Sequence, residues 1–156
     1  MDPGTSLLTS GCNLNFSALL QNDKIKQQYR LLIKKIRSQQ KSKATLQFLE
    51  RCREQEIVPP TFKVSAYMRP TNSRDRKQKW HSMLKSASLD LMSISIEETQ
   101  DKINCLAKEV DVEQRRLLEL VPLAAHDALK HDVNIKTTRW LKSECDKRGK
   151  KVQCLL

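Results

Sequence analysis

Glycine is almost absent from the interior of this chain, and that absence constrains the fold more than any other feature. Of 156 residues only three are glycine, namely Gly4, Gly11 and Gly149, and all lie near the ends. A multi-stranded sheet needs several tight turns, which glycine serves best because it adopts positive φ without strain. The long glycine-free interior therefore predicts an all-α fold.

The apolar residues are sparse and recur at helical spacing. They make up 38 % of the chain, and aromatic residues make up only 4 %. Such a small number of apolar residues suits narrow stripes of Leu, Ile and Val, as in helix bundles and coiled coils, better than a broad core. We expect one domain, built as a basic helical bundle or as extended antiparallel helices that include a long coiled-coil-like helix.

The first half of the chain contains a capping residue and a proline pair that delimit a helix. Asn22 can cap its start, and Pro59 with Pro60 must end it, because proline lacks the N–H donor and restricts the residue before it. The apolar pattern fades in the middle, so the pattern allows either one bent helix or two. The end of this helix and the segment after it are expected to form a structural turn, in which Phe62 folds back on the helix. Its residues are Leu49, Cys52, Val58, Pro59 and Phe62.

The second half holds weaker stop signals. Ser95 with Glu98 forms a capping box that can divide the next helical stretch; otherwise a single helix runs through it. Pro122 can open the last helix and Gly149 can close it. The expected segments are a disordered tail 1–21; a helical domain 22–152, with helices about 22–56, 72–94, 96–121 and 122–148 and an extended linker 57–71; and a tail 153–156.

Basic residues are concentrated on one face of the first helix. Between Asp23 and Arg53 there are ten Lys or Arg and two Asp or Glu. The cations recur every three or four residues, whereas Ile25, Tyr29 and Ile36 occupy another face, so one side can pack while the other meets a polyanion. With a second basic block near the C-terminus, the candidate phosphate-contacting residues are Lys26, Arg30, Lys34, Arg37, Lys41, Lys136, Arg139, Lys142 and Lys147.

The formal net charge of +11 is unevenly distributed. Residues 86–135 carry five bases and ten acids, whereas residues 63–85 and 136–156 each carry seven bases against one and two acids. The acidic middle can neutralise part of the basic flanks, and the surplus favours an external anionic partner. RNA or DNA, bound without regard to sequence, is the first candidate.

Other classes of function lack their signals. The chain contains no phosphate-binding loop, dinucleotide fingerprint, zinc-protease or nucleophile-elbow motif, so we expect no enzyme, no cofactor and no metal. Five widely spaced cysteines indicate reduced thiols. The uncharged run from Pro3 to Asn22 is polar and has no basic start, so neither a membrane span nor a signal peptide is expected. These features predict an intracellular protein, nuclear or cytoplasmic and not secreted.

Two short segments carry a resemblance to a known family. Leu49, Cys52, Val58 and Pro59 in FLERCREQEIVPPTFKV, together with KTTRWLKSECDKRGKK at 136–151, resemble the region ahead of the catalytic domain in Penelope-like retroelement reverse transcriptases. The resemblance implies a basic helical region that helps to hold template RNA or DNA. The chain ends before a polymerase domain would begin, so it implies neither polymerase nor endonuclease activity here.

Three alternatives to nucleic-acid binding remain at this point. The cations can simply solvate a bundle and pair with the acidic middle. The stretch Trp80–Leu120 can form a homodimeric coiled coil, which would make this a protein-interaction or scaffold protein. The basic helix can lie on an anionic membrane, although it lacks the large Trp, Phe and Leu face that such helices use.

Overall fold

The computed structural model describes residues 17–62 and 74–155, and this part of the chain is helical. Three long helices form the fold: α3 (Asp23–Glu54), α4 (Arg74–Leu120) and α5 (His126–Leu155). Two short 3-10 turns accompany them: η1 (Pro60–Phe62) and η2 (Leu123–Ala125). No strand occurs within the two described ranges, which confirms the all-α prediction.

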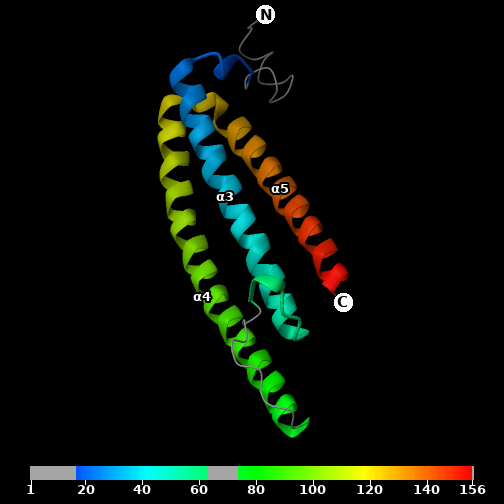
Figure 1. Cartoon of the computed structure of the whole chain (residues 1–156). Coiled ribbons are helices and arrows are strands. Elements are labelled where there is room, and N and C mark those ends of the chain that lie inside the picture. Colours follow the sequence, from blue (N-terminus) through cyan, green and yellow to red (C-terminus); the bar gives the residue numbers. More distant parts are fainter. Residues whose placement is uncertain (1–16, 63–73, 156) are drawn as a thin grey trace, which may run out of the picture.

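The long helices form an elongated bundle with α3 in the middle (Figure 1). Helix α3 contacts both α4 and α5, whereas α4 and α5 meet mainly where η2 joins them. Helix α4 runs antiparallel to α3, and α5 runs parallel to it. Because α4 has 47 residues and α3 has 32, the first part of α4 projects beyond the end of α3.

Helix α3 is continuous, which resolves the alternative between one helix and two. The side-chain oxygen of Asn22 accepts hydrogen bonds from the backbone N–H groups of Lys24 and Ile25, at 3.0 and 3.3 Å, so the predicted cap is confirmed. At the other end Glu56 adopts a φ of 54°, and the Ile57 N–H donates to the Cys52 carbonyl at 2.8 Å. This left-handed closure ends the helix at Glu54, before the prolines.

Helix α4 is also continuous, which resolves the alternative left open here in favour of a single helix and replaces the expected helices 72–94 and 96–121. The hydroxyl of Thr99 donates to the Ser95 carbonyl at 2.7 Å, and Ser93 donates to Leu89 in the same way at 3.0 Å. These hydroxyls therefore bond back into the helix and do not cap a new one. Met92 and Ile103, on either side of the expected break, are both buried, and this packing favours an unbroken helix.

Helix α5 differs from the expected 122–148 at both ends. Pro122 precedes the 3-10 turn η2, and the α-helix itself begins at His126. The helix passes through Gly149 and reaches Leu155, so the predicted stop at Gly149 and the tail from 153 are wrong. One glycine costs a helix only about 1 kcal/mol relative to alanine, which neighbouring turns readily offset.

Replacement of Gly149 by alanine tests this continuation. A Cβ at this position would lie 4.0 Å from the nearest heavy atom, Nη1 of Arg51, which is ordinary van der Waals contact. We expect Gly149→Ala to raise the free energy of unfolding by about 0.5–1 kcal/mol, because alanine loses less backbone entropy. Urea unfolding followed by circular dichroism measures the change. A loss of stability would instead indicate a left-handed helix end at this glycine.

The main core lies where all three helices meet. Leu32 and Ile36 from α3 pack with Leu117 from α4 and with Leu129 and Val133 from α5. Leu19 and Leu20, from the helical turn that precedes α3, pack against the same cluster. The prediction of a disordered tail is therefore wrong for residues 17–21, because two leucines there reach the core; residues 1–16 lie outside the described part.

A second, smaller cluster holds the proline turn. Cys52 and Met92 are fully buried, and Val58 and Phe62 pack against them. Residues 60–62 form η1 in place of the predicted extended backbone, because the Phe62 N–H donates to the Pro59 carbonyl at 2.9 Å. The rest of the predicted linker, including Val64, lies outside the described residues. Burial raises the pKa of the Cys52 thiol, which suits a packing residue and not a nucleophile.

One buried polar side chain in α3 is unsatisfied. Gln40 is 1 % exposed, and neither its amide nitrogen nor its amide oxygen has a hydrogen-bond partner within the described structure. We expect Gln40→Leu to raise the free energy of unfolding by about 1–3 kcal/mol, since it removes two unpaired polar atoms from the interior. The exposed Gln27→Leu serves as the control and should change stability by less than about 0.5 kcal/mol. Destabilisation by Gln40→Leu would contradict this assignment.

Candidate nucleic-acid interface

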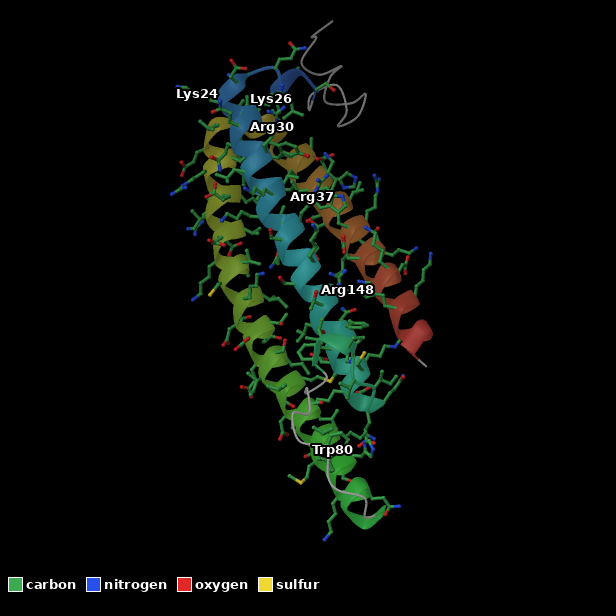
Figure 2. The ribbon with its side chains drawn as sticks, in the orientation of Figure 1. Lys24, Lys26, Arg30, Arg37, Trp80 and Arg148 are labelled. Atoms are coloured by element: carbon green, nitrogen blue, oxygen red, sulfur yellow. The ribbon has the colours of Figure 1, made fainter. Side chains whose placement is uncertain are left out.

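Five cations form a row along the exposed side of α3, which we call the basic ladder. It consists of Lys26, Arg30, Lys34, Arg37 and Lys41, and every member is exposed. The row arises because the buried residues of the same helix, such as Leu32 and Ile36, hold the other side against the core. Figure 2 labels Lys26, Arg30 and Arg37 in succession along α3.

The ladder borders a shallow open depression that continues toward α5, and we call the whole the basic groove. One part has a volume of about 480 Å³ and is lined entirely by α3, including Arg30, Lys34, Arg37 and Lys41. The adjoining part shares Arg37 and Lys41 and is completed from α5 by Trp140, Ser143, Glu144 and Lys147. The groove therefore presents cations from two helices that are remote in sequence.

Arg37 is held in the groove by an aromatic ring from α5. Its guanidinium carbon lies 4.6 Å from the centroid of the Trp140 ring, within the range of a cation–π contact. A guanidinium stacked in this way keeps its N–H edge available for an anion, because stacking uses the face of the group. The contact also joins α3 to α5 beside the ladder.

Glu144 is the one acidic residue that lines the groove, and its charge is compensated. Arg148 donates to its carboxylate at 2.5 Å, and Lys147 lies 3.6 Å from the other oxygen. The hydrogen bond from Arg148 lowers the pKa of Glu144 below its ordinary value, and Lys147 adds to the effect. The carboxylate therefore orders Lys147 in the groove and Arg148 on its other oxygen, and the local charge remains positive.

The four basic residues of α5 that are predicted to contact phosphates differ in their surroundings. Lys147 lines the groove, whereas Lys136 is engaged between the helices: it donates to the Tyr29 hydroxyl and pairs with Asp132 at 3.3 Å. Tyr29 in turn donates to Asp132 at 3.0 Å, and burial, followed by this hydrogen bond, raises the pKa of Tyr29. The spacing of Lys136 suggested a phosphate contact, but the side chain joins α5 to α3.

Arg139 and Lys142 are exposed but do not line the groove. At 100° per residue they are turned by about 100° and 160° from Trp140, which faces α3. Arg139 and Lys142 could therefore contact phosphates only through a second surface, separate from the groove. Trp140 and Glu144 line the groove although neither was predicted from the sequence, and Arg148 binds Glu144. The i,i+4 spacing of these three residues could have indicated them, since it places them along one side of a helix.

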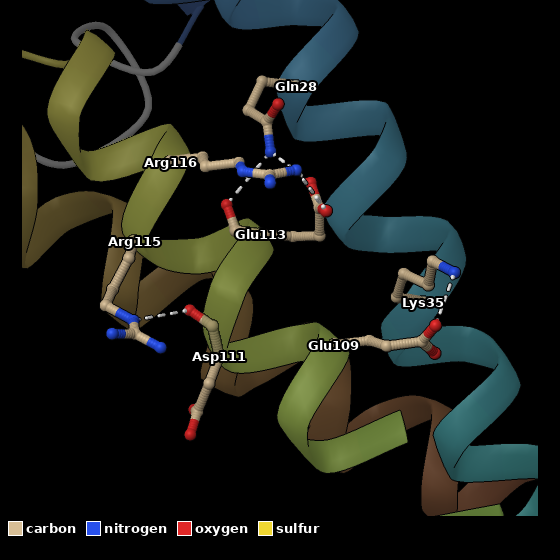
Figure 3. A network of polar contacts seen from close by, with 7 residues as sticks. All are labelled: Gln28, Lys35, Glu109, Asp111, Glu113, Arg115 and Arg116. Carbon is tan, nitrogen blue, oxygen red and sulfur yellow. Dashed lines mark hydrogen bonds and ion pairs between the residues drawn. The ribbon is translucent and has the colours of Figure 1, made fainter. Parts of the chain in front are cut away.

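The acidic middle of the chain pairs with bases that lie outside the ladder, as Figure 3 shows for Lys35 and Arg116. Glu109 pairs with Lys35 at 3.3 Å, while buried Glu113 accepts from Gln28 at 2.6 Å and pairs with Arg116 at 3.1 Å. Asp111 is exposed on another side of α4 (Figure 3). Among the described residues, no ladder cation forms an ion pair. The positive surplus therefore remains at the groove.

Neither a metal centre nor a membrane span is found in the described ranges. No cluster of three or more His, Cys, Asp or Glu side chains within residues 17–62 and 74–155 could hold a metal ion. In the same ranges, none of the helices combines the length and the apolar character that crossing a bilayer requires.

No protein-family model matches the chain, and neither a curated protein nor a solved structure does so. The resemblance to Penelope-like reverse transcriptases consequently depends on the two short motifs alone. The geometry of the groove has to carry the functional argument.

Proposed function

We propose that this protein is a non-enzymatic nucleic-acid-binding module that contacts backbone phosphates through the basic groove. One observation carries the proposal: the exposed cations of the ladder form no ion pair in the described structure, although Lys35, the residue next to Lys34, pairs with Glu109. A row of cations without ion pairs at a groove favours a polyanion.

The length of the ladder suits a nucleic-acid strand. From Lys26 to Lys41 the helix rises about 22 Å at 1.5 Å per residue. One strand of B-form duplex presents about six phosphates over that distance, at one per 3.4 Å of helix axis. The five cations of the ladder thus match the number of phosphates within reach. An anionic membrane fits less well, since the groove lacks the broad apolar face of a membrane-surface helix.

The lining of the groove favours backbone contact over base reading. Its polar side chains are mainly Lys and Arg, which as phosphate contacts position a nucleic acid without specifying its sequence. Its aromatic residues are Tyr29 and Trp140, and a cation lies over each ring, Lys136 over Tyr29 and Arg37 over Trp140, so neither ring is an open platform for stacking bases. We therefore propose binding that is indifferent to sequence.

The short motifs shared with Penelope-like retroelements agree with this role. If the resemblance reflects common origin, the module corresponds to the accessory region ahead of the polymerase, and its ligand is the template. The resemblance suggests a biological context but identifies no residue that contacts the nucleic acid. The groove accounts for phosphate binding without it.

Titration of the full chain against fluorescent oligonucleotides tests the proposal. Two unrelated duplexes and two unrelated single strands of equal length, read by anisotropy at low salt, form the set. We expect the two members of each pair to bind with dissociation constants within about threefold of each other, as backbone contacts require. Absence of binding to all four would contradict the proposed function, and strong preference for one sequence would contradict its mechanism.

A further inference from the structure

The first half of α4 bears an apolar row that is partly or largely open to solvent, which we call the outer seam. It consists of Trp80, Leu84, Ala87, Leu91 and Ile94, which recur in alternating steps of four and three. Leu91 and Ile94 are 47 and 52 % exposed, and Met83 beside the seam is 70 % exposed. Ser88 and Met92, which are turned by about 100° from Ala87 and Leu91, are buried. The outer seam therefore lies on a flank of α4, beside the side that packs on α3.

The structure narrows the homodimer surface that the sequence suggested. Within the range Trp80–Leu120, Ile103, Leu106 and Leu117 are buried in the bundle of their own chain. These residues are not available to a second copy. Five large apolar residues of this range remain exposed. Met83, Leu91 and Ile94 belong to the outer seam or lie beside it, and Val112 and Leu120 lie further along α4. Figure 2 labels Trp80 on the part of α4 that projects beyond α3.

We propose that two copies of the chain pair antiparallel through the outer seam, about a two-fold axis at Ala87. This register places Trp80 opposite Ile94 of the second copy and Met83, beside the seam, opposite Leu91, while Leu84 lies opposite Asp90 at the edge of the contact. The small Ala87 lies at the centre, where the two helices can approach closely. A two-fold contact joins the same surface of both copies, so this surface must complement itself. The outer seam meets this condition because it has an apolar residue at each end.

Charge selects the antiparallel arrangement over the parallel one. The four–three spacing of the seam continues into Glu98 and Asp101, both exposed. A parallel dimer would place each of these acids opposite its own copy, and facing like charges are destabilising. The antiparallel register separates them. It also brings Lys79 near Glu97 of the second copy, because both lie along one edge of the seam, eight and ten residues from Ala87.

Pairing through the outer seam leaves the basic groove accessible, since the groove lies on α3 and α5. The dimer would carry one groove on each side of its axis. This inference does not depend on nucleic-acid binding, and its test requires no nucleic acid.

Sedimentation equilibrium of the full chain, at concentrations up to about 100 µM, measures the assembly. We expect a particle of twice the mass of one chain, and a single-chain mass for Leu91→Asp/Ile94→Asp. Leu123→Asp is the matched control, because Leu123 is 83 % exposed and lies in η2, away from the seam. It should dimerise like the wild type. Circular dichroism verifies that all variants keep the same helical content.

Charge reversal then tests the direction of pairing. Lys79→Glu and Glu97→Lys should each raise the dimer dissociation constant by about 5- to 10-fold, and the double variant should restore it. A monomeric wild type at the highest concentration would overturn the proposal. So would a double-Asp variant that remains dimeric. Failure of the double charge reversal to restore affinity would overturn the antiparallel register.

Discussion

Replacement of Arg30, Lys34 and Arg37 together by glutamine is expected to weaken binding to every nucleic acid alike. Each phosphate contact contributes about 0.7 to 0.9 logarithmic units of affinity per tenfold change in salt, so the loss of three contacts near 0.1 M salt lowers affinity roughly 100- to 500-fold. The helix should persist, because glutamine has nearly the helix propensity of lysine and arginine. Anisotropy titration measures the loss, with circular dichroism as the check on folding.

The control for this variant removes the same number of positive charges from another helix. Lys102, Lys108 and Arg115 are exposed on α4 and line no part of the groove. Their replacement by glutamine should change affinity less than about threefold, since charges beyond a Debye length of about 10 Å are screened. An equal loss in both variants would show that net charge alone determines binding, and would contradict a defined groove.

Truncation of a core leucine gives the largest expected effect on stability. Leu117 is fully buried in the cluster where α3, α4 and α5 meet. Leu117→Ala removes apolar contacts and leaves a cavity, so we expect it to lower the free energy of unfolding by about 2–5 kcal/mol. A domain of this size has little more than that to lose, and the variant should unfold at much lower urea concentration.

Leu123→Ala is the matched control, because this leucine is 83 % exposed in η2. It should change the free energy of unfolding by less than about 0.5 kcal/mol. Both variants are compared at one protein concentration, since assembly makes apparent stability depend on concentration. Equal effects of the two substitutions would contradict the position of the main core.

The sequence predicts best those features that depend on neighbouring residues. The lack of internal glycine and the apolar periodicity indicate an all-α fold, and the side chain of Asn22 caps α3 as its position suggested. The five ladder cations share one exposed side because helical spacing alone determines it. For these features the local rule and the packed structure agree.

Features that local signals misjudge are those that packing decides. Ser95 can start a helix and Gly149 can end one, but each preference amounts to only about 1 kcal/mol. Burial along α3 outweighs the preference of Ser95, and the helical turns on both sides of Gly149 outweigh the preference of the glycine. The contact of Arg37 with Trp140 joins residues on different helices, so no local pattern predicts it. The spacing of Lys136 predicts a phosphate contact for the same reason: its actual partner, Tyr29, lies on another helix, which no local pattern reveals.

The salt dependence of binding tests the central claim most directly. Five ladder contacts predict a slope of log K against log salt of roughly −3.5 to −4.5 for the wild type. The variant with Arg30, Lys34 and Arg37 replaced by glutamine should have a slope shallower by about 2 to 3, for duplex and single strand alike. An identical slope for the two proteins would show that the ladder meets no phosphate, and would contradict the proposed function of the groove.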